Sequence, residues 1–193
     1  MTRVRIYTRK GDTGTTGLLF GGARISKADP RADAYGSTDE AVSALGLARA
    51  EFGALTDRTE ARLHELIVRV QRELFVVGAE LATHTDRRNR LTPGTSLVTA
   101  EMVTALEAEI DSLEERFPMP AEFVIPGETV PGAAIDVART TVRRAERRVT
   151  ALVEAGELPA DSHVLPYLNR LADLLFVAAR AADGGFLPVR QAD

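Results

Sequence analysis

The chain of 193 residues contains no cysteine, which excludes disulfide bonds and metal sites built on thiolates. It has no apolar run near the 18 residues that a membrane-spanning helix needs, and its N-terminus has no apolar signal core. We therefore expect a cytoplasmic protein that does not enter a membrane.

Histidine is also scarce, since only His64, His84 and His163 occur, and none has a glutamate three residues before it. Di-iron sites in ferritin-like bundles are built on Glu-x-x-His pairs. No two histidines stand at helical ligand spacing, and there is no Ser-His-Asp signature. We predict no metal site formed by protein side chains alone.

The bulk composition is that of a globular protein, with 45% hydrophobic and 27% charged residues. The length fits one domain over residues 1–193 with a real core. A net charge of -4 and a pI near 5.5 argue against broad nucleic-acid binding, although a local basic patch could still bind an anion.

Apolar residues recur at intervals of three and four along most of the chain, as in helices with one buried face. A fifth such segment follows Asp161 or Ser162, either of which could cap it, and Gly184 stops it. No segment reads as a substantial strand. We predict an all-α five-helix bundle with ferritin-like up-and-down packing. The first four helices are expected over residues 31–50, 59–82, 99–117 and 135–152.

The helix over residues 135–152 carries an unusual charge pattern. Five arginines and one glutamate between Arg139 and Arg148 give a local charge of +4 in an acidic chain. Like charges one turn apart destabilise a helix, so the pattern suggests a bound anion, with a solvated basic face as the alternative. Arg139, Arg143 and Glu146 border the apolar stripe, and we expect them to be partly buried. Two others, Arg144 and Arg148, should point into solvent.

A Gly/Thr-rich run, TRKGDTGTTGL, lies near the N-terminus. Its glycines allow close backbone approach, and its hydroxyl, N–H and cationic groups could cradle phosphate. Its spacing matches neither a P-loop nor a Rossmann motif, and a flexible arm is the alternative. We treat residues 1–20 as a possible ATP-binding arm, in which Asp12 could face Mg²⁺, and residues 184–193 as a loose tail. The candidate residues of the run are Thr8, Arg9, Lys10, Gly11, Asp12, Thr13, Gly14, Thr15 and Thr16.

Three further residues have an ordinary interpretation beside a functional one. Asp39 reads as a charge in the first half of its helix. Asn169 could hydrogen-bond a ribose or a base, or could join two helices. Lys27 lies in a loop that also carries Arg24.

Four stretches together resemble one family, the PduO-type ATP:cob(I)alamin adenosyltransferases. They are TRKGDTGTTGL, GGARISKADPRADAYGSTDE, FVIPGETVPGAAIDVARTTVRRAERR and PYLNRLADLLFVAAR. Residues 51–122 match mostly in helical character.

The resemblance implies a homotrimer with an ATP and corrinoid site at each subunit interface. The family are transferases that move the 5′-deoxyadenosyl group of ATP onto the cobalt of cob(I)alamin or of cob(I)yrinic acid a,c-diamide, releasing triphosphate. A flavoprotein reductase as electron donor and a cobalamin-dependent enzyme as acceptor of the product are the partners implied. A non-catalytic nucleotide- or cobalamin-binding carrier is the alternative.

The resemblance also implies roles for individual residues. The loop Thr8–Thr16 would wrap the triphosphate of Mg²⁺-ATP, with Lys27 nearby. Arg139, Arg143 and Glu146 would face the nucleotide, and Asn169 would contact it. Asp39 would pair with Arg139 across the subunit boundary, and Phe123 would help keep the lower axial ligand of the corrinoid off the cobalt.

Overall fold

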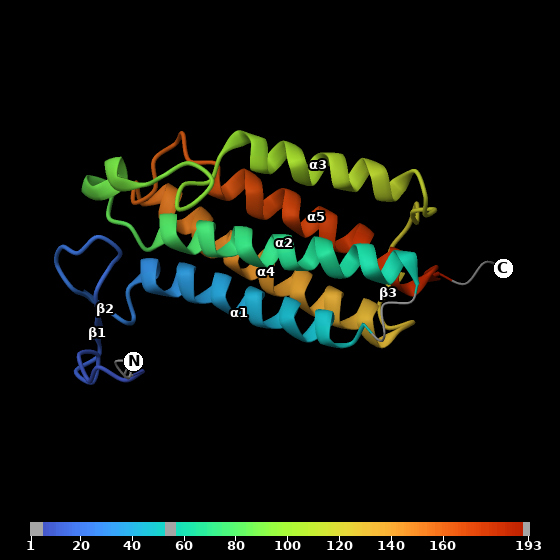
Figure 1. Ribbon diagram of the computed structural model, residues 1–193, viewed down its shortest axis with the longest axis horizontal. Helices are drawn as coiled ribbons and strands as arrows, with labels where there is room; N and C mark the ends of the chain where they lie inside the picture. Colours follow the sequence, from blue (N-terminus) through green and yellow to red (C-terminus); the bar gives the residue numbers. More distant parts are fainter. Residues whose placement is uncertain (1–5, 53–56, 191–193) are drawn as a thin grey trace, which may run out of the picture.

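The computed structural model describes residues 6–52 and 57–190, and most of these are helical (Figure 1). The predicted all-α class is confirmed. Successive α-helices run in opposite directions along the long axis of the molecule (Figure 1). The helices are α1 (Pro30–Ala50), α2 (Arg58–Leu81), a 3₁₀ helix η1 (Thr85–Arg90), α3 (Ala100–Glu114), α4 (Val130–Glu154) and α5 (Val164–Asp183).

The core lies where α4 packs between α1 and α5, with α2 against α1 and α3 against α5. Its side chains are mainly Leu, Val, Ile and Ala, and Leu45, Ile67 and Val142 are among those fully buried. Tyr167 is also buried, and its hydroxyl donates to Glu73 over 2.7 Å. Burial and the nearby Glu73 carboxylate both raise the pKa of Tyr167. Among the described residues, no helix combines the length and apolarity that a membrane span requires.

Helix starts follow local capping chemistry. Asp29 accepts a hydrogen bond from the N–H of Arg31, and Thr129 accepts one from the N–H of Gly132. Because Thr129 is the N-cap, α4 begins at Val130, five residues earlier than predicted. A proline lies in its first turn. The N-cap of α5 is His163, one residue after the predicted Ser162, and it makes no side-chain cap hydrogen bond. The Ser162 hydroxyl nevertheless accepts from the N–H of Val164 over 3.3 Å, at the first residue of the helix.

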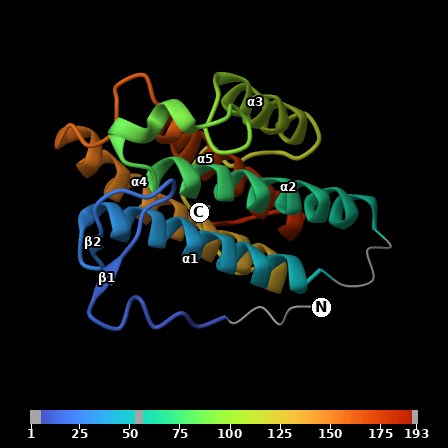
Figure 2. The same cartoon turned by 60° about the vertical axis from the view of Figure 1, so that its left-hand side comes forward.

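Short strands occur where none was expected. β1 (Thr15–Thr16) pairs with β2 (Ile25–Ser26), and β3 (Val124–Ile125) pairs with β4 (Leu187–Pro188), both antiparallel. Part of the segment predicted to be a loose tail is therefore paired with the connection before α4. The β1–β2 pair lies at the end of the bundle where α1 begins, and β3 lies at the opposite end (Figures 1 and 2).

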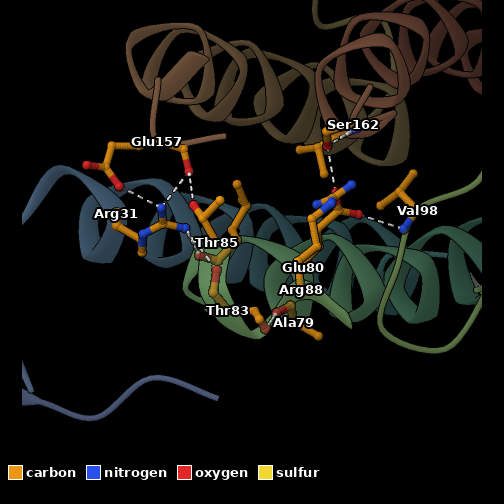
Figure 3. Close-up of polar contacts among 11 residues, drawn as sticks. Arg31, Ala79, Glu80, Thr83, Thr85, Arg88, Val98, Glu157 and Ser162 are labelled. Carbon is orange, nitrogen blue, oxygen red and sulfur yellow. Dashed lines mark hydrogen bonds and ion pairs between the residues drawn. The ribbon is translucent and has the colours of Figure 1, made fainter. Parts of the chain in front are cut away.

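A buried polar network holds the end of the bundle where α1 begins (Figure 3). The carboxylate of Glu80, only 1% exposed, accepts from Arg88 over 2.6 Å, from Ser162 over 2.6 Å and from the N–H of Val98 over 2.7 Å. Arg31 donates to the carbonyls of Leu81, Thr83 and Glu157 beside it. Because these buried charges are paired and hydrogen-bonded, they fix the connection from α2 to α3.

The seam between α1 and α4 corrects one prediction. Arg144 forms an ion pair with Glu40, and Arg148 forms one with Asp33 and a hydrogen bond with Ser37. Both arginines were expected to point into solvent, and Arg144 is exposed as predicted, whereas Arg148 is half-buried. Both also face carboxylates of α1, so each has a partner on the neighbouring helix that the sequence did not reveal.

Candidate functional site

One face between α4 and α5 collects four of the residues predicted to bind the nucleotide. Asn169 donates to Glu146 over 2.9 Å, and the guanidinium of Arg139 lies 6.0 Å from the centre of the Phe176 ring. Arg143 lies between Arg139 and Glu146, one helical turn from each. Both contacts fit one register of the two antiparallel helices. We call the surface formed by Arg139, Arg143, Glu146, Asn169 and Phe176 the α4–α5 strip.

Burial along the strip differs from the prediction at one position. Arg139 and Glu146 are half-buried as expected, but Arg143 is exposed. Within the residues that the structure describes, no hydrogen bond or ion pair engages its guanidinium. The exposed cation between two partly buried charges leaves room for a negatively charged group.

Buried groups behind the strip were missed in the sequence. Asp136 accepts from Nε of Arg139 over 2.9 Å through Oδ1 and from Arg180 over 2.6 Å through Oδ2. Arg180 also donates to Asp183 over 2.9 Å. The available signals were an aspartate three residues before Arg139 and a lone arginine in an otherwise apolar stretch of α5.

The charge state of Arg180 follows from these partners. Burial alone lowers its pKa, but the hydrogen bonds to Asp136 and Asp183 outweigh this and raise the pKa above that of an ordinary arginine. The guanidinium therefore stays charged at every working pH.

Gly132 makes the close packing around Asp183 possible. A Cβ on Gly132 would lie 1.9 Å from Oδ1 of Asp183, which accepts hydrogen bonds from the N–H and the hydroxyl of Thr129. The start of α4 can thus approach the end of α5 only where the side chain is absent.

We expect Gly132→Ala to lower the free energy of unfolding by about 2 kcal/mol, because Asp183 must leave its partners. Urea denaturation followed by circular dichroism measures this. Gly185→Ala is the control, since a Cβ there meets nothing within 4 Å. Equal stability of the two variants would contradict the close approach.

A cavity of about 780 Å³ opens beside the α4–α5 strip. Phe123 lies at its rim with its side chain 87% exposed, and the N–H of Val189 donates to the Phe123 carbonyl over 2.9 Å. The walls combine apolar and cationic groups, which suits a large, mostly apolar ligand beside an anion. The lining residues are Pro120, Ala121, Glu122, Phe123, Val124, Pro126, Asp136, Arg139, Phe176, Arg180, Val189 and Arg190.

The N-terminal loop is held in shape by two cations that follow it. Arg24 donates to the carbonyls of Lys10 and Thr15, each over 2.8 Å, and to the Thr15 hydroxyl over 3.0 Å. The N–H of Lys27 donates to the Gly14 carbonyl over 2.9 Å. The Lys27 amine lies beside Gly11, because a Cβ there would be 3.1 Å from Nζ.

Most side chains of the loop are open to solvent. Gly11, Thr15 and Thr16 are half-buried, and Arg9 has a positive φ of 61° with its guanidinium over the Tyr7 ring. The exposed members are Thr8, Arg9, Lys10, Asp12, Thr13 and Gly14. The loop therefore offers hydroxyls and cations to a ligand.

Asp39 lies apart from the α4–α5 strip. It is exposed on α1, at a groove of about 420 Å³ between α1 and α2 that also includes Leu19 and Phe75. Its neighbour Glu40 is level with Arg144, and Arg139 lies about 7.5 Å further along α4 and faces α5. No ion pair of the described residues joins Asp39 to Arg139.

The predicted site residues thus fall into two groups in one chain. The loop with β1 lies at the end of the bundle where α1 begins (Figures 1 and 2), and Lys27 directly follows β2 there. Asp39 lies near the middle of α1, at the α1–α2 groove. Arg139 and Phe123 line the cavity formed by α4, α5 and the connection that precedes α4. No hydrogen bond or ion pair between described residues links the two groups. Among those residues, no cluster of three or more His, Cys, Asp or Glu could hold a metal ion.

Comparison with known proteins adds a consistent set of similarities. The family model described as cobalamin adenosyltransferase matches residues 6–182. A corrinoid adenosyltransferase from Citrobacter freundii is 42% identical over 177 residues, which are 91% of this chain and 93% of that protein. The corrinoid adenosyltransferase PduO from Salmonella typhimurium is 39% identical over 178 residues, 92% of this chain but 49% of that protein. The chain spans about half the length of the PduO relatives that it matches.

A solved structure is similar over nearly the whole chain. It is a variant of the PduO-type ATP:corrinoid adenosyltransferase from Lactobacillus reuteri, complexed with cobalamin and ATP. The TM-score is 0.84 and the sequence identity 31%, and the match covers 97% of this chain and 100% of that one.

Proposed function

The chain belongs to the cobalamin adenosyltransferase family, and from this we propose that it transfers the 5′-deoxyadenosyl group of ATP to the cobalt of cob(I)alamin. The products are adenosylcobalamin and triphosphate. The observation that carries the proposal is the α4–α5 strip, where cationic and hydrogen-bonding groups border a cavity with apolar walls.

The chemistry sets the tasks of the protein. The electron pair of Co(I) attacks C5′ of ATP, the Co–C bond forms, and the C5′–O bond breaks with its electron pair leaving on triphosphate. Because Co(I) is a strong nucleophile, the protein need not supply one. It has to hold C5′ in line with the cobalt, where positioning is worth about 7–11 kcal/mol, and to stabilise the charge of the leaving group.

The two groups of site residues divide these tasks. The loop Thr8–Thr16 and Lys27 would wrap the triphosphate, with Mg²⁺ bound on the ATP phosphates. Arg143 and Arg139 would stabilise the departing charge, since a guanidinium fork matches phosphate oxygens. Glu146 and Asn169, already joined by a hydrogen bond, would contact the nucleoside.

The separation of Asp39 from Arg139 supports a site shared between chains. One chain presents Asp39 at the α1–α2 groove and Arg139 on the α4–α5 strip. Opposite charges on two distant faces favour contact between copies. A closed homotrimer would repeat this heterologous contact three times, and each boundary would bring the loop of one copy to the strip of the next.

Phe123 is proposed to cover the face of the corrinoid from which a base or water would reach the cobalt. We expect Phe123→Ala to lower kcat about tenfold, which is about 1.4 kcal/mol. The free energy of unfolding should change by less than about 0.5 kcal/mol, because the ring is mostly exposed. Steady-state kinetics with cob(II)alamin and a reductant, together with urea denaturation, measures both. An unchanged kcat would refute this role.

The proposed activity is tested by mixing the purified protein with Mg²⁺-ATP and chemically reduced cobalamin. Loss of the cob(I)alamin absorbance over many turnovers, with one triphosphate released per adenosylcobalamin, is the expected result. Binding of one equivalent of product or nucleotide without turnover would favour the carrier instead. No conversion at any Mg²⁺ concentration would exclude the transferase.

A further inference from the structure

Arg139 is held at one atom only. Its Nε donates to Asp136, and within the described part of the chain its two terminal nitrogens make no hydrogen bond. The ring of Phe176 lies under the guanidinium and under that of Arg180, at 6.0 Å and 5.4 Å. The side chain is therefore held by Asp136 and Phe176 of its own chain. Its two terminal nitrogens remain available to a ligand or to a second copy.

The group that holds Arg139 is itself held from deeper in the protein. Asp136 is 5% exposed and Arg180 is 2% exposed. Arg180 bridges Asp136 and Asp183, and Asp183 accepts from the N–H and hydroxyl of Thr129. We call Asp136, Arg180 and Asp183 the buried relay. Asp183 contacts the N-cap of α4, Arg180 links it within α5 to Asp136, and Asp136 of α4 holds Arg139.

The charges explain why the relay needs each member. Asp183, Arg180, Asp136 and Arg139 alternate in sign and sum to zero. A planar guanidinium can face two carboxylates at once, which the ammonium of lysine does with less definite geometry. Nε of Arg180 is buried without a hydrogen-bond partner among the described residues. An unpaired buried donor costs free energy, so the orientation of Arg180 is dictated by the two carboxylates.

We propose that Asp136 and Arg180 are positioning residues, which hold Arg139 by its Nε so that both terminal nitrogens stay available outside the chain. The inference rests on the proposed function insofar as Arg139 contributes to the site. Without Arg180, Asp136 would turn towards other donors and release Arg139. Without the Asp136 charge, Arg139 would sample several rotamers. The rotamer that contacts the nucleotide would then be less populated.

A double-mutant cycle separates positioning from a merely structural role. Asp136→Asn keeps the size of the side chain and is expected to lower kcat/KM for ATP about tenfold. In an Arg139→Ala background the same substitution should change kcat/KM less than twofold, because the residue through which Asp136 acts is gone. An equal factor in both backgrounds would overturn the proposal.

The second buried network supplies a matched control. Glu80→Gln removes a charge from a buried carboxylate that is also paired with an arginine (Figure 3). It should lower the melting temperature as Asp136→Asn does. Its effect on kcat/KM should be the same in the wild-type and Arg139→Ala backgrounds. A dependence of the Glu80→Gln effect on Arg139 would mean that loss of stability alone produces the coupling.

A readout independent of activity is the ¹H–¹⁵N signal of the Arg139 Nε–H, assigned by its absence in Arg139→Lys. We expect slow exchange with solvent in the wild type and fast exchange in both Asp136→Asn and Arg180→Lys, each shown to be folded by circular dichroism. Slow exchange that persists in both variants would overturn the proposal. If the wild type transfers no adenosyl group, the proposed function fails. The exchange rate of the Arg139 Nε–H would still show whether Asp136 and Arg180 hold Arg139.

Discussion

Replacement of Arg143 by alanine is expected to lower kcat about a hundredfold, which corresponds to about 2.7 kcal/mol of transition-state stabilisation. Arg143 is exposed on the α4–α5 strip between Arg139 and Glu146. Because the described structure offers its guanidinium no carboxylate, we propose that its counter-charge is the departing triphosphate. The interaction strengthens as charge develops on the leaving oxygen, so kcat should fall more than KM rises.

Steady-state kinetics with saturating cob(I)alamin and varied ATP measures this effect. Arg144→Ala is the matched control, since it removes the same charge from the next residue. Arg144 faces α1 and pairs with Glu40, so its kcat should stay within about threefold of the wild type. Near-normal kinetics of Arg143→Ala would refute its role.

Asp39→Asn is expected to abolish measurable turnover while the fold is kept. The side chain is exposed on α1, so its loss leaves no buried group unpaired in the chain. In the proposed assembly the substitution removes the counter-charge of Arg139 at the subunit boundary. That arginine then lacks its partner in the site.

The measurement is steady-state kinetics alongside circular dichroism and size-exclusion chromatography. Glu40→Gln is the control, because Glu40 is the adjacent carboxylate and pairs with Arg144 of its own chain. It should retain most of the activity. Equal losses in the two variants would show that the position of Asp39 has no special role.

The helices could be predicted because their signals are local. Apolar spacing placed the second helix at residues 59–82, and α2 spans Arg58–Leu81. The same spacing put Arg139 and Glu146 beside the buried stripe, where both are half-buried. The early start of α4 was missed because Val130 and Pro131 look like part of a Pro/Gly-rich connection, whereas a proline in the first turn fits a helix capped by Thr129.

Partners distant in the sequence could not be predicted in the same way. Glu40 precedes Arg144 by 104 residues, so the five arginines between Arg139 and Arg148 gave no sign that two of them face α1. Asp136 and Arg180 are 44 residues apart, and each alone reads as an ordinary helix charge. The contact between Glu146 and Asn169 depends on the register of α4 and α5, which only packing determines. Asn169 was identified as a site residue through the family resemblance, and the structure shows that it donates a hydrogen bond to Glu146.

The pairing of β3 with β4 illustrates the same limit. Two residues on each side are too few for a strand pattern, and Val124 and Pro188 are separated in the sequence by all of α4 and α5. The pairing matters for the site because it holds the segment that presents Phe123 at the cavity.

The central claim is that each site is shared between two copies of the chain, and mixing two variants, one inactive and one strongly impaired, tests it directly. Asp39→Asn keeps Arg139, and Arg139→Ala keeps Asp39. In randomly mixed trimers, roughly one boundary in four would combine an intact Asp39 with an intact Arg139. We predict that co-expressed variants recover about a quarter of the wild-type activity. Mixed assemblies that form, as shown by two distinct affinity tags, but are no more active than Arg139→Ala alone would contradict the account.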